Sequence, residues 1–233
     1  MADSQLILAT YNIHACIGAD GRFDPYRTAR VLCELNADVI ALQEVEHHQI
    51  GELNVLEFLA AETGTSAIAG PTLQRTNRHY GNALLSKLPV LSYDLVNLTW
   101  SGHEPRGAID AVLRYDNQRM RVIATHLGLS PGERRRQVRQ LLARLQAQDA
   151  EIVVLMGDLN EWFLWGRILR WLHARFQPTP KYATFPARWP LLALDHLWVS
   201  PRRRLSKLEV HFSKLSRRAS DHLPLKGIIN LLG

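Results

Sequence analysis

Polar side chains that suit acid–base or metal chemistry follow apolar runs at several places in this chain. Each run is short and apolar enough to form a buried strand, and the polar residue comes where that strand would end. A strand end holds a side chain on a rigid scaffold while leaving it open to solvent. These residues are Asn12, Glu44, His126, Asp158 and Asn160. Asp195, Asp221 and His222, which do not end a predicted strand, complete the set.

Each of these residues alone is a weak signal, because Asn or Asp after a strand is more often a turn former or a helix cap. Together they supply carboxylates for a metal ion, imidazoles for proton transfer and amides that stabilise a developing oxyanion. Asp158 and Asn160 are two residues apart, so a continuing strand would place both on one face. The combination predicts a hydrolytic site.

The elements that must position these residues are predicted from hydrophobic patterns and turn residues. The predicted strands cover residues 6–13, 38–43, 81–86, 112–115, 121–125, 152–156 and 194–199. The predicted helices cover residues 25–35, 53–62, 132–148 and 163–176, and the Pro-rich residues 177–190 are predicted to form a long loop. Strands in the middle of the chain lack intervening helices, which favours two packed sheets with helices outside over an alternating parallel fold.

Composition indicates a folded globular protein, because 46% of the 233 residues are hydrophobic and 21% are charged. This length suits one α/β domain, so we expect residues 1–233 to form a single domain. No apolar run approaches the roughly 18 residues that span a bilayer, and the N-terminus lacks the basic start of a secretion signal. Cys16 and Cys33 lack zinc-ligand spacing, which indicates reduced thiols in a cytoplasmic protein.

The net charge of +6 comes mainly from clusters of arginine. Arginine forms bidentate hydrogen bonds with phosphate, so the clusters favour an anionic partner, although each one alone also fits a solvated surface. Charge does not distinguish nucleic acid, an anionic membrane surface and a small phosphorylated substrate. The clusters are Arg134 to Arg136, Arg202 to Arg204, and Arg217 with Arg218.

Seven ordered motifs resemble those of the endonuclease/exonuclease/phosphatase family, which has the DNase I-like fold. They are TYNIH, ALQEVE, YGNALLSKLP, ATHL, GDLN, LDHLWVS and SDHLPL, and they extend from Thr10 to Leu225. The resemblance implies an α/β (α+β) protein built as a four-layer αββα sandwich, with two mixed, mostly antiparallel sheets flanked by helices. It also implies one or two Mg²⁺ or Mn²⁺ ions and hydrolysis of a phosphodiester or phosphomonoester.

By the same resemblance, Glu44 is the principal metal carboxylate, and Asn12 and Asp221 lie close to that ion or its waters. Asp158 aligns the attacking water or binds a second metal ion. The chemistry agrees, since Mg²⁺ prefers oxygen ligands and keeps several waters, so one or two carboxylates suffice.

Proton transfer is assigned by resemblance to His222, oriented by Asp195, as general base or acid at the scissile phosphate. The roles of Asp158 and His222 can be exchanged. Asn160 and His126 would hydrogen-bond the non-bridging oxygens as negative charge grows on them.

Weaker signals surround this set. Arg106 is either a phosphate clamp or a surface cation, because arginine suits both. Asn82 would contact substrate phosphate or support the site from behind, while Tyr80 and His14 are expected only near its rim.

The segment after GDLN, residues 161–176, is rich in tryptophan and arginine and allows three interpretations. It could be an outer helix that packs its apolar stripe on a sheet, an interfacial helix at an anionic membrane, or a binder of single-stranded nucleic acid. The histidine in ATHL, His126, is similar to that of the DNase I and sphingomyelinase branches, whereas abasic-site endonucleases of the family typically have tyrosine there.

The sequence therefore predicts a Mg²⁺- or Mn²⁺-dependent phosphoesterase that acts on a lipid or another small phosphodiester. A DNA or RNA nuclease is the first alternative, and a non-catalytic phosphate-binding module is the second. The complete set of metal and acid–base residues argues against the second. We expect a cytoplasmic monomer that can bind an anionic membrane peripherally, with nucleic acid as the alternative partner.

Overall fold

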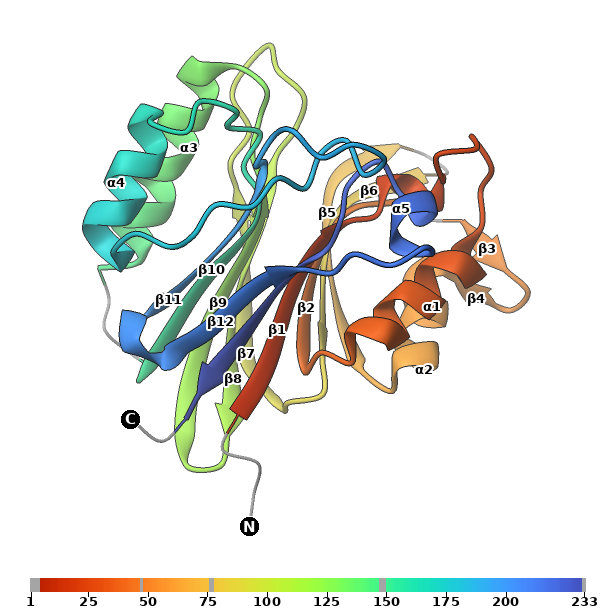
Figure 1. The fold of residues 1–233 in the computed structure, drawn as a ribbon, viewed down its shortest axis with the longest axis horizontal. Coiled ribbons are helices and arrows are strands. Elements are labelled where there is room, and N and C mark those ends of the chain that lie inside the picture. Colours follow the sequence, from red (N-terminus) through yellow and green to blue (C-terminus); the bar gives the residue numbers. More distant parts are fainter. Residues whose placement is uncertain (1–4, 47, 76–77, 147–149, 232–233) are drawn as a thin grey trace.

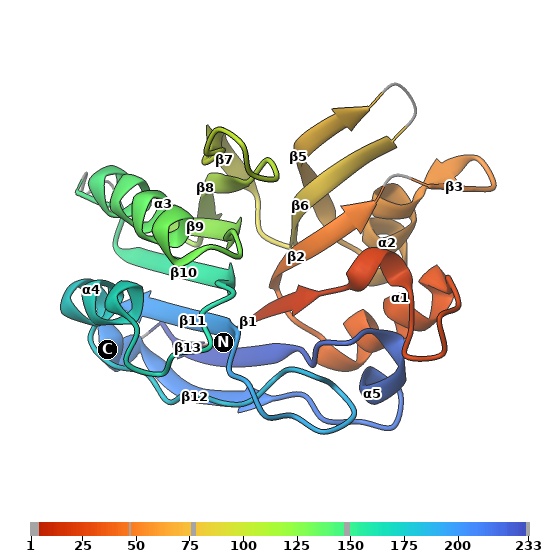
Figure 2. The same cartoon turned by 90° about the horizontal axis from the view of Figure 1, so that it is seen from above.

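Two large β-sheets lie face to face in the computed structural model, which describes residues 5–46, 48–75, 78–146 and 150–231 (Figures 1 and 2). The first sheet contains, in spatial order, β12 (Leu205–Val210), β13 (Leu225–Asn230), β1 (Gln5–Asn12), β2 (Val39–Glu46), β6 (Arg78–Ser86) and β5 (Ser66–Arg75). The second contains β11 (Asp195–Ser200), β10 (Ile152–Asp158), β9 (Gln118–His126), β8 (Gly107–Tyr115) and β7 (Val90–Asn97). The pairs β1–β2 and β9–β10 are parallel, and the other pairs in these sheets are antiparallel.

Helices cover the outer face of each sheet and complete four layers. The helices α1 (Pro25–Leu35) and α2 (Val55–Thr63) lie on the first sheet, and α3 (Pro131–Arg144) and α4 (Arg167–Phe176) lie on the second (Figure 2). A short hairpin of β3 (Gln49–Ile50) and β4 (Leu53–Asn54) precedes α2, and the short α5 (Ser216–Ala219) precedes β13. The expected αββα sandwich is confirmed. Among the described residues, no helix is long and apolar enough to cross a bilayer.

The central strands are apolar on both faces because each face is buried against a different layer. Leu8 of β1 packs between the two sheets, whereas the next residue, Ala9, faces α1 and α2. In β10, Val154 points between the sheets and Leu155 points toward α3 and α4. Successive side chains of a strand point to opposite faces, so a strand in this position needs a continuous apolar run.

Local signals set the boundaries of the first two helices. Asp24 accepts a hydrogen bond from the backbone N–H of Arg27 at 2.9 Å, and Pro25 occupies the first helical turn of α1. Asn54 and Glu57 form a capping box at the start of α2, which therefore begins at Val55 and not at Leu53 as predicted. The helix predicted over residues 132–148 is α3, which spans Pro131–Arg144; residues 147–148 lie outside the described part of the chain.

The helix predicted over residues 163–176 is wrong at its start, because α4 begins only at Arg167. The backbone N–H of Phe163 donates to the Glu161 carboxylate at 3.1 Å, and the N–H of Gly166 donates to the Phe163 carbonyl at 2.7 Å. These bonds form a turn in place of the first helical turn. Trp162 to Trp165 consequently lie in a loop.

The sequence prediction missed β5, β7, β12 and β13, and it assigned only the end of β8. The edge strand β7 is exposed along most of its length, so it needs no apolar run. Gly70 and Pro71 interrupt the strand pattern inside β5. These strands are specified by their neighbours in the sheet more than by their own residues.

Gly157 holds the parallel pairing of β9 and β10 next to Asp158. Its φ is +150°, and a Cβ added there would lie 1.9 Å from the carbonyl oxygen of Thr125 on β9. Only glycine permits so close an approach of two backbones.

We predict that Gly157→Ala lowers the free energy of unfolding by about 3 kcal/mol, because the added methyl group must push β9 and β10 apart. Gly64→Ala is the matched control. Gly64 also has a positive φ, of +63°, but has open space around its α-carbon, so we expect a cost of only about 1 kcal/mol. Urea unfolding measures both values, and equal losses would show that the Thr125 contact is unimportant.

Candidate active site

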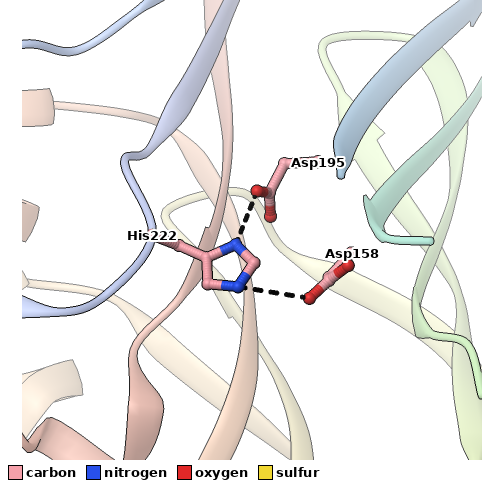
Figure 3. Close-up of side chains that lie close together, drawn as sticks. All are labelled: Asp158, Asp195 and His222. Atoms are coloured by element: carbon pink, nitrogen blue, oxygen red, sulfur yellow. Dashed lines mark hydrogen bonds and ion pairs between the residues drawn. The ribbon is translucent and has the colours of Figure 1, made fainter. Parts of the chain in front are cut away.

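Functional side chains from both sheets meet at one end of the sandwich. The carboxyl ends of β1, β9 and β10 lie there, and β11 begins there because it runs antiparallel to β10. Asp158 is paired with His126 on one side and with Asp195 on the other. His222 follows α5 and reaches the same place from the first sheet (Figure 3).

Asp158 lies at the centre of this group and is almost fully buried, with 1% of its surface exposed. Its Oδ2 accepts a hydrogen bond from Asn12 Nδ2 at 3.1 Å and lies 3.7 Å from His222 Nε2 and 3.5 Å from His126 Nε2. Its Oδ1 accepts the backbone N–H of Asn160 at 2.8 Å. The carboxylate is therefore fixed in position by groups from several strands.

His222 and Asp195 form a hydrogen-bonded pair. The ring nitrogen Nδ1 of His222 lies 2.8 Å from Asp195 Oδ2, which fixes a proton on Nδ1 and turns Nε2 toward Asp158 (Figure 3). The hydroxyl of Ser220 donates to the carbonyl of Asn12 at 2.7 Å and accepts the backbone N–H of His222 at 3.2 Å. Ser220 was missed by the sequence analysis, although it is the first residue of the SDH motif.

Opposing effects set the proton affinity of this buried pair. Burial alone would lower the pKa of His222, but the carboxylates of Asp195 and Asp158 raise it. Burial raises the pKa of Asp158, although the positive charge of His222 opposes this effect. Nε2 of His222 and Oδ2 of Asp158 lie 3.7 Å apart, so the charge on each group affects the protonation of the other.

Glu44 occupies a β-bulge and does not end its strand as predicted. The register of β2 against β6 shifts between Leu42 and Val45, and Glu44 has a φ of +56°. Asn12 Nδ2 donates to Glu44 Oε1 at 2.9 Å, so one amide connects Glu44 with Asp158. A positive φ in a residue other than glycine is costly, and such strain is often found at functional sites.

The oxygen donors around Asn12 fit a divalent cation that prefers hard ligands. Glu44 and Asp158 bring two carboxylates within reach of one amide, and the burial of Asp158 leaves its negative charge poorly solvated. Asn12 points its amide nitrogen at both carboxylates, while its Oδ1 accepts the N–H of His14 at 3.0 Å. In this orientation Asn12 positions the two carboxylates, and its role as a metal ligand stays a prediction.

A second group of potential ligands overlaps the first, because donor atoms of Asp158, Asp195 and His222 all lie within 4.8 Å of one another. The hydrogen bond between His222 and Asp195 already occupies one atom of each. Asp221 lies on the rim, where its Oδ1 is 3.8 Å from Nδ1 of His14 and both side chains are about 40% exposed. Its metal role also stays a prediction.

Arg106 is buried, which excludes a solvated surface cation. It donates to Nδ1 of His126 at 3.2 Å and to the carboxylate of Glu104 at 3.0 Å, and only 6% of its surface is exposed. Burial, followed by the positive charges of Arg106 and His222, lowers the pKa of His126 well below its usual value. His126 is therefore a neutral imidazole beside Asp158.

The remaining predicted residues support this arrangement. Asn160 has a φ of +51° and donates from Nδ2 to the Leu127 carbonyl at 2.9 Å, which places its amide 3.0 Å from His126 Nε2. Asn82 donates to the Gly107 carbonyl at 2.9 Å and so fixes the start of β8 next to Arg106. Burial and the nearby Glu44 carboxylate raise the pKa of Tyr80, which keeps its hydroxyl protonated.

Comparisons with known proteins identify relatives of this chain. The sequence model of the Endonuclease/Exonuclease/phosphatase family matches residues 9–222. The chain is 28% identical over 242 residues to Uncharacterized protein YbhP of Escherichia coli strain K12, with 95% of each chain covered.

Two solved structures share the fold. The endonuclease/exonuclease/phosphatase of Bacteroides vulgatus has a TM-score of 0.81 at 19% identity, covering 98% of this chain and 100% of that one. The human Nocturnin catalytic domain with bound sulfate anion has a TM-score of 0.70 at 18% identity, covering 96% and 92%. Because the family match extends over nearly the whole chain and the fold agrees, this protein belongs to the endonuclease/exonuclease/phosphatase family of metal-dependent hydrolases that act on phosphate ester bonds.

Proposed function

We propose that the protein is a Mg²⁺- or Mn²⁺-dependent phosphodiesterase that hydrolyses a lipid or another small phosphodiester. The observation that carries this proposal is the buried Asp158 carboxylate facing His222, itself paired with Asp195, with Glu44 connected to Asp158 through Asn12. This arrangement combines a proton-transfer pair with hard oxygen ligands.

Different residues of the candidate active site would carry out proton transfer, stabilise the phosphate oxygens and hold the metal ion. Either His222 or Asp158 takes a proton from the attacking water, and the Asp195 carboxylate stabilises the charged imidazole when His222 is the base. Neutral His126 and the amide of Asn160 lie beside Asp158 and can donate hydrogen bonds to non-bridging oxygens. Glu44, Asp158 and Asn12 would hold or orient a metal ion, which when bound would polarise the phosphate.

The exposed apolar side chains near the site support a lipid surface as the partner. In the loop after Asn160, 52% of Phe163 and 78% of Trp165 are exposed. In the loop before Asp195, 69% of Trp189 and 79% of Leu191 are exposed. We call these two segments, residues 162–165 and 189–192, the apolar rim.

The apolar rim differs from the interfacial helix considered from sequence. The apolar stripe of α4 is buried against the second sheet through Ile168, Leu169, Leu172 and Phe176, as in an ordinary outer helix. Within residues 161–176, the exposed aromatic side chains are Trp162, Phe163 and Trp165, which all lie in the loop before α4. Aromatic and aliphatic side chains at such a position suit the interfacial region of a bilayer.

The free thiols Cys16 and Cys33 are consistent with a cytoplasmic enzyme that binds membranes peripherally. Nucleic acid is the alternative partner, because the aromatic side chains of the apolar rim could also stack on bases. We further propose that the enzyme acts as a monomer.

We expect Mg²⁺- or Mn²⁺-dependent hydrolysis of bis-p-nitrophenyl phosphate and of a phospholipid, with kcat lowered by about 10²- to 10⁴-fold in Asp158→Asn and His222→Asn. The surface carboxylate Asp94, which pairs with Arg144, provides the control Asp94→Asn.

Plasmid DNA and single-stranded RNA belong in the same assay. Preferred turnover of either nucleic acid would favour the nuclease alternative over a lipid substrate. Full activity in Asp158→Asn would contradict the assigned chemistry, and metal binding without turnover of any substrate would favour the phosphate-binding module.

Metal binding can be measured without turnover. Mg²⁺ at 100 times its dissociation constant should stabilise the fold by about 2.7 kcal/mol, because it binds only the folded state. Glu44→Gln should raise the dissociation constant by roughly tenfold or more. The exposed Glu52 provides the control Glu52→Gln. Thermal unfolding with and without Mg²⁺ measures the effect, and equal responses of both variants would exclude Glu44 as a ligand.

Wild-type protein should sediment with phosphatidylcholine vesicles that contain phosphatidylserine, and Trp165→Ser or Trp189→Ser should each weaken this binding by roughly tenfold, because a large apolar contact is lost. Tyr93, which is 53% exposed on β7, provides the control Tyr93→Ser. The membrane proposal fails if neutral and anionic vesicles both leave the wild-type protein in the supernatant.

A further inference from the structure

A cavity of about 470 Å³ beside the active site is lined mainly by cations. Its walls are Ala19, Asp20, Arg188, Lys214, Arg217 and Arg218, which we call the basic pocket. Three separate segments build it: the turn before α1, the loop between α4 and β11, and the residues in and around α5. Figure 1 shows that loop crossing from α4 to the neighbourhood of α5.

No carboxylate that lines the basic pocket is available to balance its positive charge. Its only acid, Asp20, accepts hydrogen bonds on both oxygens from Arg27, at 2.9 and 3.0 Å. This pairing lowers the pKa of Asp20. The charge of Asp20 is therefore balanced by Arg27, which does not line the pocket. Within the described part of the chain, Arg188, Lys214, Arg217 and Arg218 make no ion pair with a carboxylate. A group of cations without counter-charges attracts an anion.

Arg217 is held in place and is not a freely solvated side chain. Its guanidinium donates to the carbonyl of Arg188 at 3.3 Å and packs over the ring of Phe212 at 5.2 Å. Its Nε is buried and has no hydrogen-bond partner. The contacts with Arg188 and Phe212 hold the Arg217 side chain at the wall of the basic pocket.

Backbone hydrogen bonds connect the basic pocket to the catalytic residues. The N–H of Ala19 donates to the carbonyl of Arg218 at 3.0 Å, and the N–H of Ala187 donates to the carbonyl of Asp221 at 2.6 Å. Arg218 precedes His222 by only four residues. A ligand in the pocket therefore lies against the same segment that carries His222.

We propose that the basic pocket binds a phosphate monoester group of the substrate, separate from the scissile diester, and so selects substrates that carry a second phosphate. The pocket has four cations that can meet the two charges of a phosphate monoester, which favours this group over a singly charged diester. This inference rests on the proposed phosphodiesterase function and specifies its substrate class.

The neighbouring apolar rim favours a lipid headgroup as the source of this phosphate. Arg188 in the pocket is followed directly by the exposed Trp189. Insertion of Trp189 into a membrane interface would bring the pocket to the level of the headgroups. A free phosphorylated headgroup would offer the same chemistry without the membrane.

A matched pair of soluble headgroups tests the pocket directly. Glycerophosphoinositol 4-phosphate and glycerophosphoinositol both contain a diester, and only the first carries a phosphate monoester. Calorimetry in EDTA, where no turnover occurs, should show binding of the phosphorylated compound at least about tenfold tighter to the wild-type protein. Lys214→Gln and Arg218→Gln should each remove most of this preference, and both side chains are exposed, so folding is retained.

Arg203→Gln provides the control, because it changes the same charge at an exposed position beyond the opposite end of β11. It should leave the preference unchanged. Equal affinity of the wild-type protein for the two headgroups would overturn the proposal, as would an equal loss in Arg203→Gln. If the preference depends on the pocket but no diester is hydrolysed, the pocket is established and the proposed function fails.

Vesicles distinguish the two sources of the phosphate. With a lipid source, phosphatidylinositol 4-phosphate in phosphatidylcholine vesicles should recruit the protein, and Trp189→Ser should weaken recruitment while leaving binding of the soluble headgroup intact. Tight binding of the soluble headgroup without recruitment to vesicles would retain the pocket and overturn the lipid source.

Discussion

The candidate active site depends on one buried carboxylate, Asp158, that both sheets hold in place. Asn12 reaches it from the first sheet, and His126 and Asn160 reach it from the second. His222 approaches from the first sheet and is paired with Asp195 on the second, so the site forms only when the two sheets are packed in register. Burying a carboxylate is unfavourable, and the apolar core between the sheets provides the stabilisation that offsets this cost.

Several members of the candidate site were recognisable from sequence because they end buried strands. Asp158 and His126 end strands that are apolar on both faces, so a polar residue at these positions stands out in the sequence. The bulge that presents Glu44 was not predictable, since it depends on how β2 aligns with β6. The burial of Arg106 also depends on contacts with His126 and Glu104, of which only Glu104 is close in sequence.

The loop character of Trp162 to Trp165 shows the same limit. An apolar, aromatic run before a helix fits the helical pattern equally well, and periodicity alone continues the helix backward. The helix does not extend backward, because the N–H of Phe163 donates to the Glu161 carboxylate and the N–H of Gly166 donates to the Phe163 carbonyl. These two hydrogen bonds form a tight turn. Trp162 to Trp165 are therefore exposed because this segment forms a turn and not the first turn of α4.

The segment between α4 and β11 contributes to the candidate active site, the basic pocket and the apolar rim. It carries Arg188 in the basic pocket and Trp189 in the apolar rim, and it ends at Asp195, which orients His222. The Ala187 hydrogen bond to Asp221 fixes the middle of this segment against the residues next to His222. Because this loop is fixed at Ala187 and at Asp195, its exposed residues can be substituted without moving Asp195. Substitutions at these exposed residues would therefore alter the proposed substrate preference while His222 and Asp195 stay paired.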